Sequence, residues 1–287
     1  IATVADCVPL LGENRTLVRY GLLVLAQTPR LGLQELMKIA RLNPVFEVET
    51  LKTNLDAYSL GFVIAPRLNA AGRIDHASLA FELLLEEDKI KARERAEKID
   101  EQNRLRQKIT EDIVSEVERR INRKEFDVAN PVIIELDENW SAGVLGLVAG
   151  KISDRYHRPS FIFRQNNDML RGSARSVPNF NIIEAIAECA DALLEFGGHP
   201  GAAGLSLRKE NLEIFTKMIN KLARAKLKDD DLVPVIEIDS ELEAHQINWQ
   251  LFDDLLKFEP FGQNNRQPNF FIKNMEILEM RNVGVNG

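Results

Sequence analysis

The stretch Phe196-Gly197-Gly198-His199-Pro200-Gly201-Ala202-Ala203-Gly204 decides how the fold is interpreted, because it places four glycines around one histidine within nine residues. Glycine at this density lets backbone amides approach an anionic ligand closely. The histidine can hydrogen-bond a phosphate or titrate near neutral pH. These residues predict a loop that faces a phosphate. A tight connection between strands with an incidental histidine is the alternative, and the local chemistry leaves both open.

Four further segments extend the argument outward along the chain. They are residues 3–6 with 8–10, 67–73, 172–176 and 259–262, which read Thr-Val-Ala-Asp with Val-Pro-Leu, Arg-Leu-Asn-Ala-Ala-Gly-Arg, Gly-Ser-Ala-Arg-Ser and Glu-Pro-Phe-Gly. In this order they resemble the RecJ family of single-strand-specific 5′-to-3′ DNA exonucleases, essentially from end to end. Gly197-Gly198-His199 followed by Ala202-Ala203-Gly204 resembles the signature of the DHHA1 domain, the second lobe of DHH phosphoesterases.

Composition narrows the class of protein. The chain has 287 residues, 45% hydrophobic and 28% charged, which is ordinary for a globular protein and long enough for two or more domains. No apolar run reaches membrane-spanning length and no signal peptide opens the chain. The two cysteines, Cys7 and Cys189, have no metal or redox spacing, and this fits a reducing cytoplasm.

The net charge of −7 argues against a generally basic nucleic-acid binder. The segment from Lys151 to Arg175 differs, since it holds six basic residues and two acidic ones. A protein that threads one strand through a groove needs a local positive track of this kind rather than a basic surface.

The predicted fold class is α/β, and the resemblance divides the chain into four parts. They are the C-terminal part of a DHH lobe (1–85), a long connecting helix (86–125), a DHHA1 α/β lobe (126–228) and a partial OB-type β-barrel (233–287). Residues 1–5 are apolar and predict the middle of a buried strand, and residues 281–287 resemble a strand and turn, so we expect a fragment cut at both ends.

Hydrophobic periodicity predicts the individual elements. Apolar residues recur every four positions from Leu105 to Ile121 and predict one long helix over 86–122 with an otherwise solvated, charged face. Further helices are expected at 17–27, 31–40, 78–85, 143–154, 182–196, 212–227 and 249–257. Strands are expected at 132–136, 160–163, 169–176 and 205–207, and an alternating pattern begins at 233.

Asp6 is the candidate metal ligand and a candidate catalytic residue. A carboxylate after an apolar stretch is costly to bury unless it pairs or binds a metal. The resemblance implies that this aspartate ligates one of two Mn²⁺ or Mg²⁺ ions, whose other ligands come from Asp-x-Asp and Asp-His-His motifs. Neither motif precedes Asp6 here. Since two-metal hydrolysis needs both ions, we expect this fragment alone to be inactive.

The remaining site residues are candidates for phosphate binding. Arg67, Asn69 and Arg73 are predicted to cluster in a loop, and arginine suits phosphate because its planar fork binds two oxygens. An ion-pair network with Asp75 and Glu82 is the alternative. Hydroxyls and a guanidinium around a glycine make an anion site. The resemblance implies that a 5′ phosphate is recognised with Ser173 and Arg175 as contacts, and that catalytic His199 faces the scissile or an adjacent phosphate. Ser176, Gly197 and Gly198 are expected to be substrate-binding residues beside them.

These observations favour a fragment of a metal-dependent exonuclease that degrades single-stranded DNA in repair and recombination. The resemblance implies 5′-phosphorylated single strands as partner, and allows a single-strand-binding protein or a helicase, without a membrane. Two alternatives stay open: a DHH-type phosphoesterase on short oligonucleotides or nucleoside phosphates, and a non-catalytic nucleic-acid-binding scaffold. The long helix and the OB-like tail disfavour the small-substrate enzyme.

Overall fold

The computed structural model describes residues 1–287 apart from residues 75, 124–129, 277 and 282–287. The chain forms two compact units, one made of Ile1–Pro66 with Val235–Gly287 and the other of Arg67–Pro234. In the described part of the chain, no helix is both long and apolar enough to cross a membrane.

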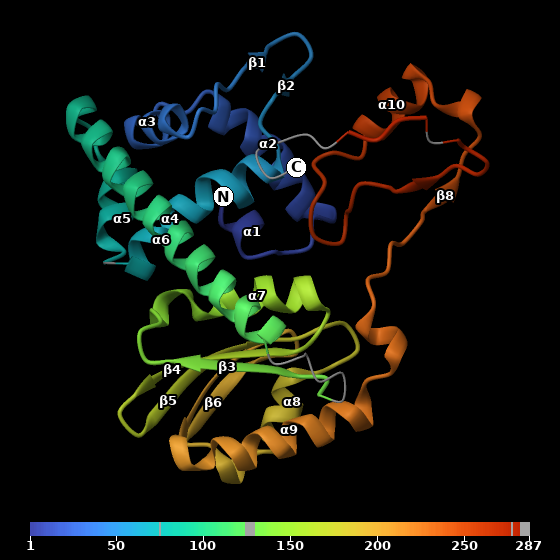
Figure 1. The fold of residues 1–287 in the computed structure, drawn as a ribbon. Coiled ribbons are helices and arrows are strands. Elements are labelled where there is room, and N and C mark those ends of the chain that lie inside the picture. Colours follow the sequence, from blue (N-terminus) through green and yellow to red (C-terminus); the bar gives the residue numbers. More distant parts are fainter. Residues whose placement is uncertain (75, 124–129, 277, 282–287) are drawn as a thin grey trace. The chain divides into compact units, whose positions relative to one another are not determined.

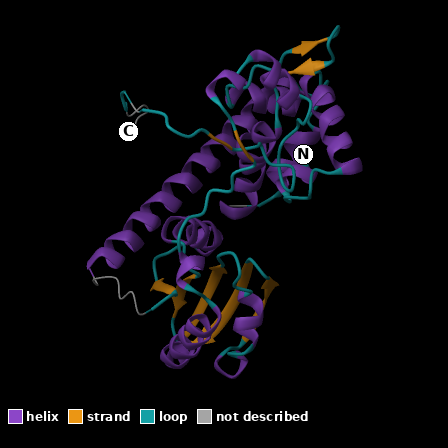
Figure 2. Ribbon diagram, turned by 90° about the vertical axis from the view of Figure 1, so that its right-hand side faces the viewer, coloured by secondary structure: helices purple, strands orange, loops and turns teal. Residues whose placement is uncertain are grey.

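The first unit is mainly helical (Figures 1 and 2). The helices predicted at 17–27, 31–40 and 249–257 are confirmed as α2, α3 and α10, although α2 begins earlier than expected. Strands β1 and β2 pair antiparallel, whereas β8 and β9 pair parallel. The elements are α1 (Ala2–Ala5), α2 (Gly12–Ala26), α3 (Leu31–Ile39), β1 (Phe46–Glu47), β2 (Lys52–Thr53), the π-helix η1 (Ser59–Ile64), β8 (Ser240–Glu241), the 3₁₀ turn η6 (Ala244–Gln246), α10 (Trp249–Leu256) and β9 (Phe270–Phe271).

The expected buried strand over residues 1–5 is wrong. Residues Ala2–Ala5 form helix α1, and none of them is buried. A short apolar run does not distinguish helix from strand, and two of these four residues are alanine, the strongest helix former. The alternating pattern after residue 233 likewise gives no strand before β8, and the side chains of Val235 and Ile236 are exposed.

The Glu-Pro-Phe-Gly segment has a structural role inside the first unit. Arg15 of α2 donates hydrogen bonds to the carbonyl oxygens of Lys257 (2.7 Å), Phe258 (3.2 Å) and Glu259 (3.0 Å). These carbonyls follow the end of α10, so one guanidinium fixes the backbone that leads from α10 into residues 259–262. Gly262 is needed there because a Cβ would lie 2.5 Å from the Leu10 side chain.

The second unit is built on a five-stranded sheet with the order β3-β4-β5-β7-β6. Only β3 and β4 are parallel, and the other neighbours are antiparallel. The elements are α4 (Ala65–Ile74), α5 (Ser78–Leu85), α6 (Lys89–Arg123), β3 (Ile133–Asp137), η2 (Ala142–Val144), α7 (Leu145–Tyr156), β4 (Ser160–Asn166), β5 (Met169–Arg175), α8 (Ile182–Ala187), η3 (Ala190–Ala192), β6 (Glu195–His199), β7 (Ala202–Arg208), η4 (Lys209–Asn211), α9 (Leu212–Lys226) and η5 (Asp229–Leu232).

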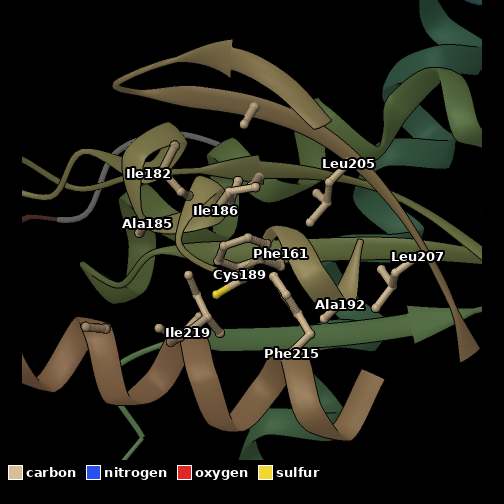
Figure 3. Packing of buried hydrophobic residues seen from close by; sticks show 14 of the residues in the cluster. Phe161, Ile182, Ala185, Ile186, Cys189, Ala192, Leu205, Leu207, Phe215 and Ile219 are labelled. Carbon is tan, nitrogen blue, oxygen red and sulfur yellow. The ribbon is translucent and has the colours of Figure 1, made fainter. Parts of the chain in front are cut away.

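Helices cover the two faces of this sheet differently (Figure 1). α8 and α9 pack against one face, where Phe215 of α9 meets Phe161 and Phe163 edge-on at 5.4 and 6.3 Å. Figure 3 shows Phe161 and Phe215 in the core, together with Cys189 and Ile219. On the other face α7 lies against β4 and β5, and α6 packs on α7. The predicted long helix, the strands of this lobe and the closing helix are therefore confirmed.

The helix expected over 182–196 is wrong in its second half. α8 ends at Ala187, a 3₁₀ turn follows, and Glu195–His199 form the edge strand β6. Gly197 and Gly198 disfavour a helix, and pairing with β7 satisfies their backbone groups instead. The glycine-rich stretch is thus a β-hairpin turning at Pro200-Gly201 rather than a loop after a helix.

Candidate nucleic-acid interface

Three neighbouring strands bring Arg175 and His199 to one face of the sheet. Arg175 of β5 pairs with Ala202 of β7, and Ala202 pairs with His199 of β6. Residues directly opposite one another in antiparallel strands project to the same side. The two side chains, which are 24 positions apart in the chain, therefore flank Ala202 on the α7 side of the sheet.

The next row on this face consists of residues with small side chains. Ser173 pairs with Gly204, and Gly204 pairs with Gly197. A Cβ built on Gly197 or on Gly204 would meet no atom of the described residues within 4 Å. Glycine weakens a strand by about 0.5–1 kcal/mol relative to alanine, so its presence where internal packing does not require it indicates close approach by another backbone or a ligand.

Two other glycines of the motifs have an internal explanation. A Cβ on Gly198 would lie 2.3 Å from the carbonyl oxygen of Ala202, and φ there is +157°. A Cβ on Gly172 would lie 2.3 Å from the Phe163 ring. Both positions face the α8 and α9 side of the sheet. Gly172 is buried in the core there, whereas Gly198 is exposed on the edge strand and is constrained by the backbone of its own hairpin. Gly198 therefore shapes the hairpin, while Gly197 and Gly204 leave the opposite face open.

Arg175 is held beneath α7. Its Nη2 atom lies 3.4 Å from the position that a Cβ of Gly146 would take, and the Ser173 hydroxyl lies 3.6 Å from the same point. Arg175 Nη1 donates a hydrogen bond to the carbonyl oxygen of Ala174 at 3.1 Å. Burial lowers the pKa of Arg175 and the positive charge of Arg73 lowers it further, while the negative charge of Asp154 acts in the opposite direction. Two arginines that repel each other at one place favour a bound anion.

The Arg67 to Arg73 motif forms a helix and not the expected loop. It lies within α4, whose Ala70 and Ala71 are fully buried. Alanine favours the helix intrinsically, and its small side chain permits close packing. Asn69 and Arg73 are exposed on this helix. Arg73 Nη1 donates to the carbonyl oxygen of Gly143 at 3.1 Å, which places this arginine against the turn before α7.

The alternative prediction, an ion pair between this motif and nearby acids, is right for Arg67 but names the wrong acid. Arg67 Nε donates to Asp100 of α6 at 2.9 Å, and this carboxylate is buried. Glu82 pairs with Arg95 instead, and Asp75 lies outside the described residues. Arg67 is therefore fixed by a buried partner that the sequence did not indicate.

Ser176 has a local structural role. Its hydroxyl donates to the carbonyl oxygen of Phe180, and its backbone N–H donates to Gly201 at 3.0 Å. These bonds tie the end of β5 to the following loop and to the Pro200-Gly201 turn. The hydroxyl of Ser173, in contrast, lies on the α7 side beside Arg175.

Asp6 is exposed, which contradicts the argument from the cost of burial. It forms the C-terminal cap of α1 in the first unit, and its backbone N–H donates to Ala2 at 2.9 Å. Among the described residues, no three histidine, cysteine, aspartate or glutamate side chains are grouped so that they could hold a metal ion. The donors present around Asp6 do not fit a two-metal centre by themselves.

Two charged residues of α6 were missed because the whole charged face was interpreted as solvated. Asp100 is buried, and Arg106 is half-buried. The pKa of Arg106 is lowered by burial first, and then by the charges of Arg73 and Arg67. The sequence held one indication. Asp100 and Asn103 are polar, yet they stand next to and four residues after the apolar Ile99, on the side of the helix that is buried.

Comparison with known proteins adds the family context. The DHHA1 domain model matches residues 129–225, and the RecJ OB domain model matches residues 238–287. The single-stranded-DNA-specific exonuclease RecJ of Bacillus subtilis is 35% identical over 288 residues, covering all of this chain and 35% of the relative. RecJ of Haemophilus influenzae is 36% identical over 294 residues, covering all of this chain and 50% of the relative. The chain thus spans one third to one half of these relatives.

Solved structures agree with the sequence comparison. RecJ of Thermus thermophilus in complex with Mn²⁺ matches with a TM-score of 0.80 at 29% identity, covering 94% of this chain and 38% of that chain. The complex with Mg²⁺ matches with a TM-score of 0.79 at the same identity, covering 93% of this chain and 39% of that chain.

Proposed function

Because the chain belongs to the RecJ family, we propose that it is part of an exonuclease that removes nucleotides from the 5′ end of single-stranded DNA, in repair and recombination. The observation that carries the proposal is the row Arg175, Ala202 and His199 beside the open glycines on one face of the sheet. This face combines cations, a hydrogen-bonding imidazole and room for a nucleic-acid backbone.

The proposed roles follow from position. Arg175, Ser173 and Arg73 would hold the terminal phosphate, because the Arg175 guanidinium and the Ser173 hydroxyl lie near the same point at Gly146 and Arg73 contacts the turn just before α7. Gly197 and Gly204 would let the sugar-phosphate backbone lie against the strands. His199 would donate a hydrogen bond to the next phosphate. Asn69 and Arg67 would support this arrangement from α4, while Gly198 and Ser176 shape the hairpin and its loop.

Divalent ions, present in the structures of Thermus thermophilus RecJ, would supply activated water and stabilise the leaving oxygen. In this chain Asp6 is the proposed ligand, but the described residues offer it no companion donors. We therefore expect this chain alone to bind single strands without hydrolysing them. Release of nucleotides by the purified chain with Mn²⁺ would contradict this expectation.

The extent of the open face favours an enzyme that binds single-stranded DNA over a phosphoesterase that acts on small substrates. The uncovered residues run along two strands, from His199 and Ala202 to Gly197 and Gly204. A nucleoside phosphate would need a closed pocket rather than an open floor. We also propose that the protein acts in the cytoplasm, since both of its cysteines are free thiols.

The test is a salt titration of binding to short single-stranded DNA oligonucleotides, with and without a 5′ phosphate. Replacing Arg175 with Ala should weaken binding of the phosphorylated strand by roughly 10–100-fold, since hydrogen bonds to charged groups contribute about 1.5–3 kcal/mol. The slope of log affinity against log salt should fall in magnitude by about 0.7, the value for one phosphate contact on a single strand.

The matched control is Lys221→Ala on α9, an exposed cation on the opposite side of the sheet. It should leave both the slope and the preference for a 5′ phosphate unchanged. Equal behaviour of Arg175→Ala and Lys221→Ala would remove the α7 side of the sheet as the binding face.

A further inference from the structure

Helix α6 carries a group of buried polar atoms that the proposed function does not use. Gln102 Oε1, Asn103 Oδ1 and Arg106 Nε are buried and have no hydrogen-bond partner within the described part of the chain. Gln102 and Asn103 stand four and three residues before Arg106, so all three share one face of the helix. A buried polar atom without a partner is costly and requires an explanation. Of the three, only Arg106 Nε is a donor, so it is the atom that an anion would satisfy, whereas the amide oxygens of Gln102 and Asn103 are acceptors.

The nearby acid on α6 is already occupied. Asp100 accepts from Arg67 at 2.9 Å through one carboxylate oxygen and pairs with Arg104 at 2.7 Å through the other. One buried carboxylate therefore balances two guanidinium groups. No charge remains on it to compensate a third arginine.

The positive charges of Arg73 and Arg67 both act on Arg106. Arg73 also repels Arg175, where the negative charge of Asp154 offsets part of the repulsion. Arg73 thus links two guanidinium groups from different elements, one on α6 and one on β5. An arrangement of three cations with partly buried donors is costly unless an anion completes it.

We propose that Arg106 is a further phosphate-binding residue, which extends the site of Arg73 and Arg175 so that α6 contacts a phosphate of the bound strand. The inference rests on the proposed function. It adds a contact between the bound strand and helix α6, which the proposed function treats only as a connection. Arg106 donates to the phosphate oxygens from Nε, which has no partner among the described residues. Asp100 acts as a positioning residue, since it fixes Arg67 beside this contact.

The test compares Arg106→Gln with Lys108→Gln in the same binding titration. Lys108 lies two residues further on the same helix, is exposed, and loses the same charge. Arg106→Gln should weaken binding about tenfold and reduce the salt slope by about 0.7, whereas Lys108→Gln should change neither. Arg106→Lys should keep the slope, because it keeps the charge, but should recover only part of the affinity.

Stability separates this role from a structural one. Removing a half-buried cation from like charges should leave the thermal unfolding midpoint unchanged or raised, whereas a structural arginine would lower it and leave the salt slope as it was. If Arg106→Gln does not fold, NMR of the arginine Nε–H groups in the parent chain decides. The Arg106 signal should shift on adding a 5′-phosphorylated strand, and an unmoved signal overturns the proposal.

The Arg175 and Arg106 variants together distinguish a failure of the proposed function from a failure of this inference. If Arg175→Ala weakens binding and Arg106→Gln matches Lys108→Gln, only the inference about Arg106 is overturned. If Arg175→Ala also has no effect, the proposed binding face itself is wrong.

Discussion

The two faces of the five-stranded sheet differ although the same strands build both. On the face under α8 and α9, Phe161, Phe163 and Phe215 fill the space completely. On the other face, α7 covers β4 and β5, and Glu195, Gly197 and His199 of the edge strand β6 are exposed. Alternation along each strand sends one residue to each side. A closely packed core and a proposed binding surface can thus lie on opposite faces of the same β-strands.

Glycine marks the difference most clearly. Gly172 exists because the Phe163 ring occupies the place of its side chain, whereas Gly204, on the neighbouring strand, borders open space in the described structure. The same residue type therefore reports a full core on one face and an uncovered surface on the other. A glycine motif in the sequence therefore does not distinguish these two causes, whereas the surroundings of each Cβ position do.

The largest expected effect tests the closed face, which is the face of the sheet under α8 and α9. Phe215→Ala should lower the free energy of unfolding by about 3–5 kcal/mol, because it removes a fully buried ring that contacts two others. Chemical denaturation measures this loss. The exposed neighbour Ile214 is the control, and Ile214→Ala should change stability by about 0.5 kcal/mol at most. Similar losses for both variants would mean that α9 does not close the core as described.

A matched pair of glycine substitutions tests both faces at once. Gly172→Ala should destabilise the fold by about 1–3 kcal/mol, since the new methyl group overlaps the Phe163 ring. Gly204→Ala should stabilise it by about 0.5–1 kcal/mol, because alanine suits a strand better. Gly204→Ala should nevertheless weaken binding of single strands, while the folded fraction of Gly172→Ala should bind normally. The comparison fails if Gly204→Ala binds as the parent does.

Much of the second unit could be predicted from the sequence, and the reason is periodicity. The long helix α6 follows from apolar residues spaced four apart, and α9 and strands β3 to β5 follow from runs that suit one element only. The failures fall where local preference was ambiguous or overridden. Residues 1–5 could be helix or strand, and β6 became a strand because β7 offers it hydrogen-bond partners distant from any local pattern.

The candidate site was predictable in part. The motifs pointed to Arg175 and His199, and the strand register places them on one face. Their roles stay predictions. Partners that depend on packing between separate elements could not be predicted, such as Asp100 for Arg67 or the approach of Arg106 to Arg73. A charged helix looks solvated in sequence, and only the fold shows which of its charges are buried.

A further expected effect concerns Cys189, which lies fully buried on the closed face. Burial, and then the negative charge of Glu188, raises the pKa of this thiol from 9.0 to about 11. The folded chain therefore keeps the proton at pH values where the unfolded chain releases it. The stability that this provides is complete below pH 9 and is lost as the pH rises toward 11.

Between pH 8 and pH 10 the parent should lose about 1 kcal/mol that Cys189→Ala does not lose, since one pKa unit corresponds to about 1.4 kcal/mol. Arg175, on the open face, stays charged over this range and contributes nothing to the difference. Urea denaturation of both proteins at the two pH values measures it, and Cys7 cancels because both retain it. Parallel pH dependence of the two proteins would show that Cys189 is open to water and that the closed face is less tightly packed than its phenylalanines indicate.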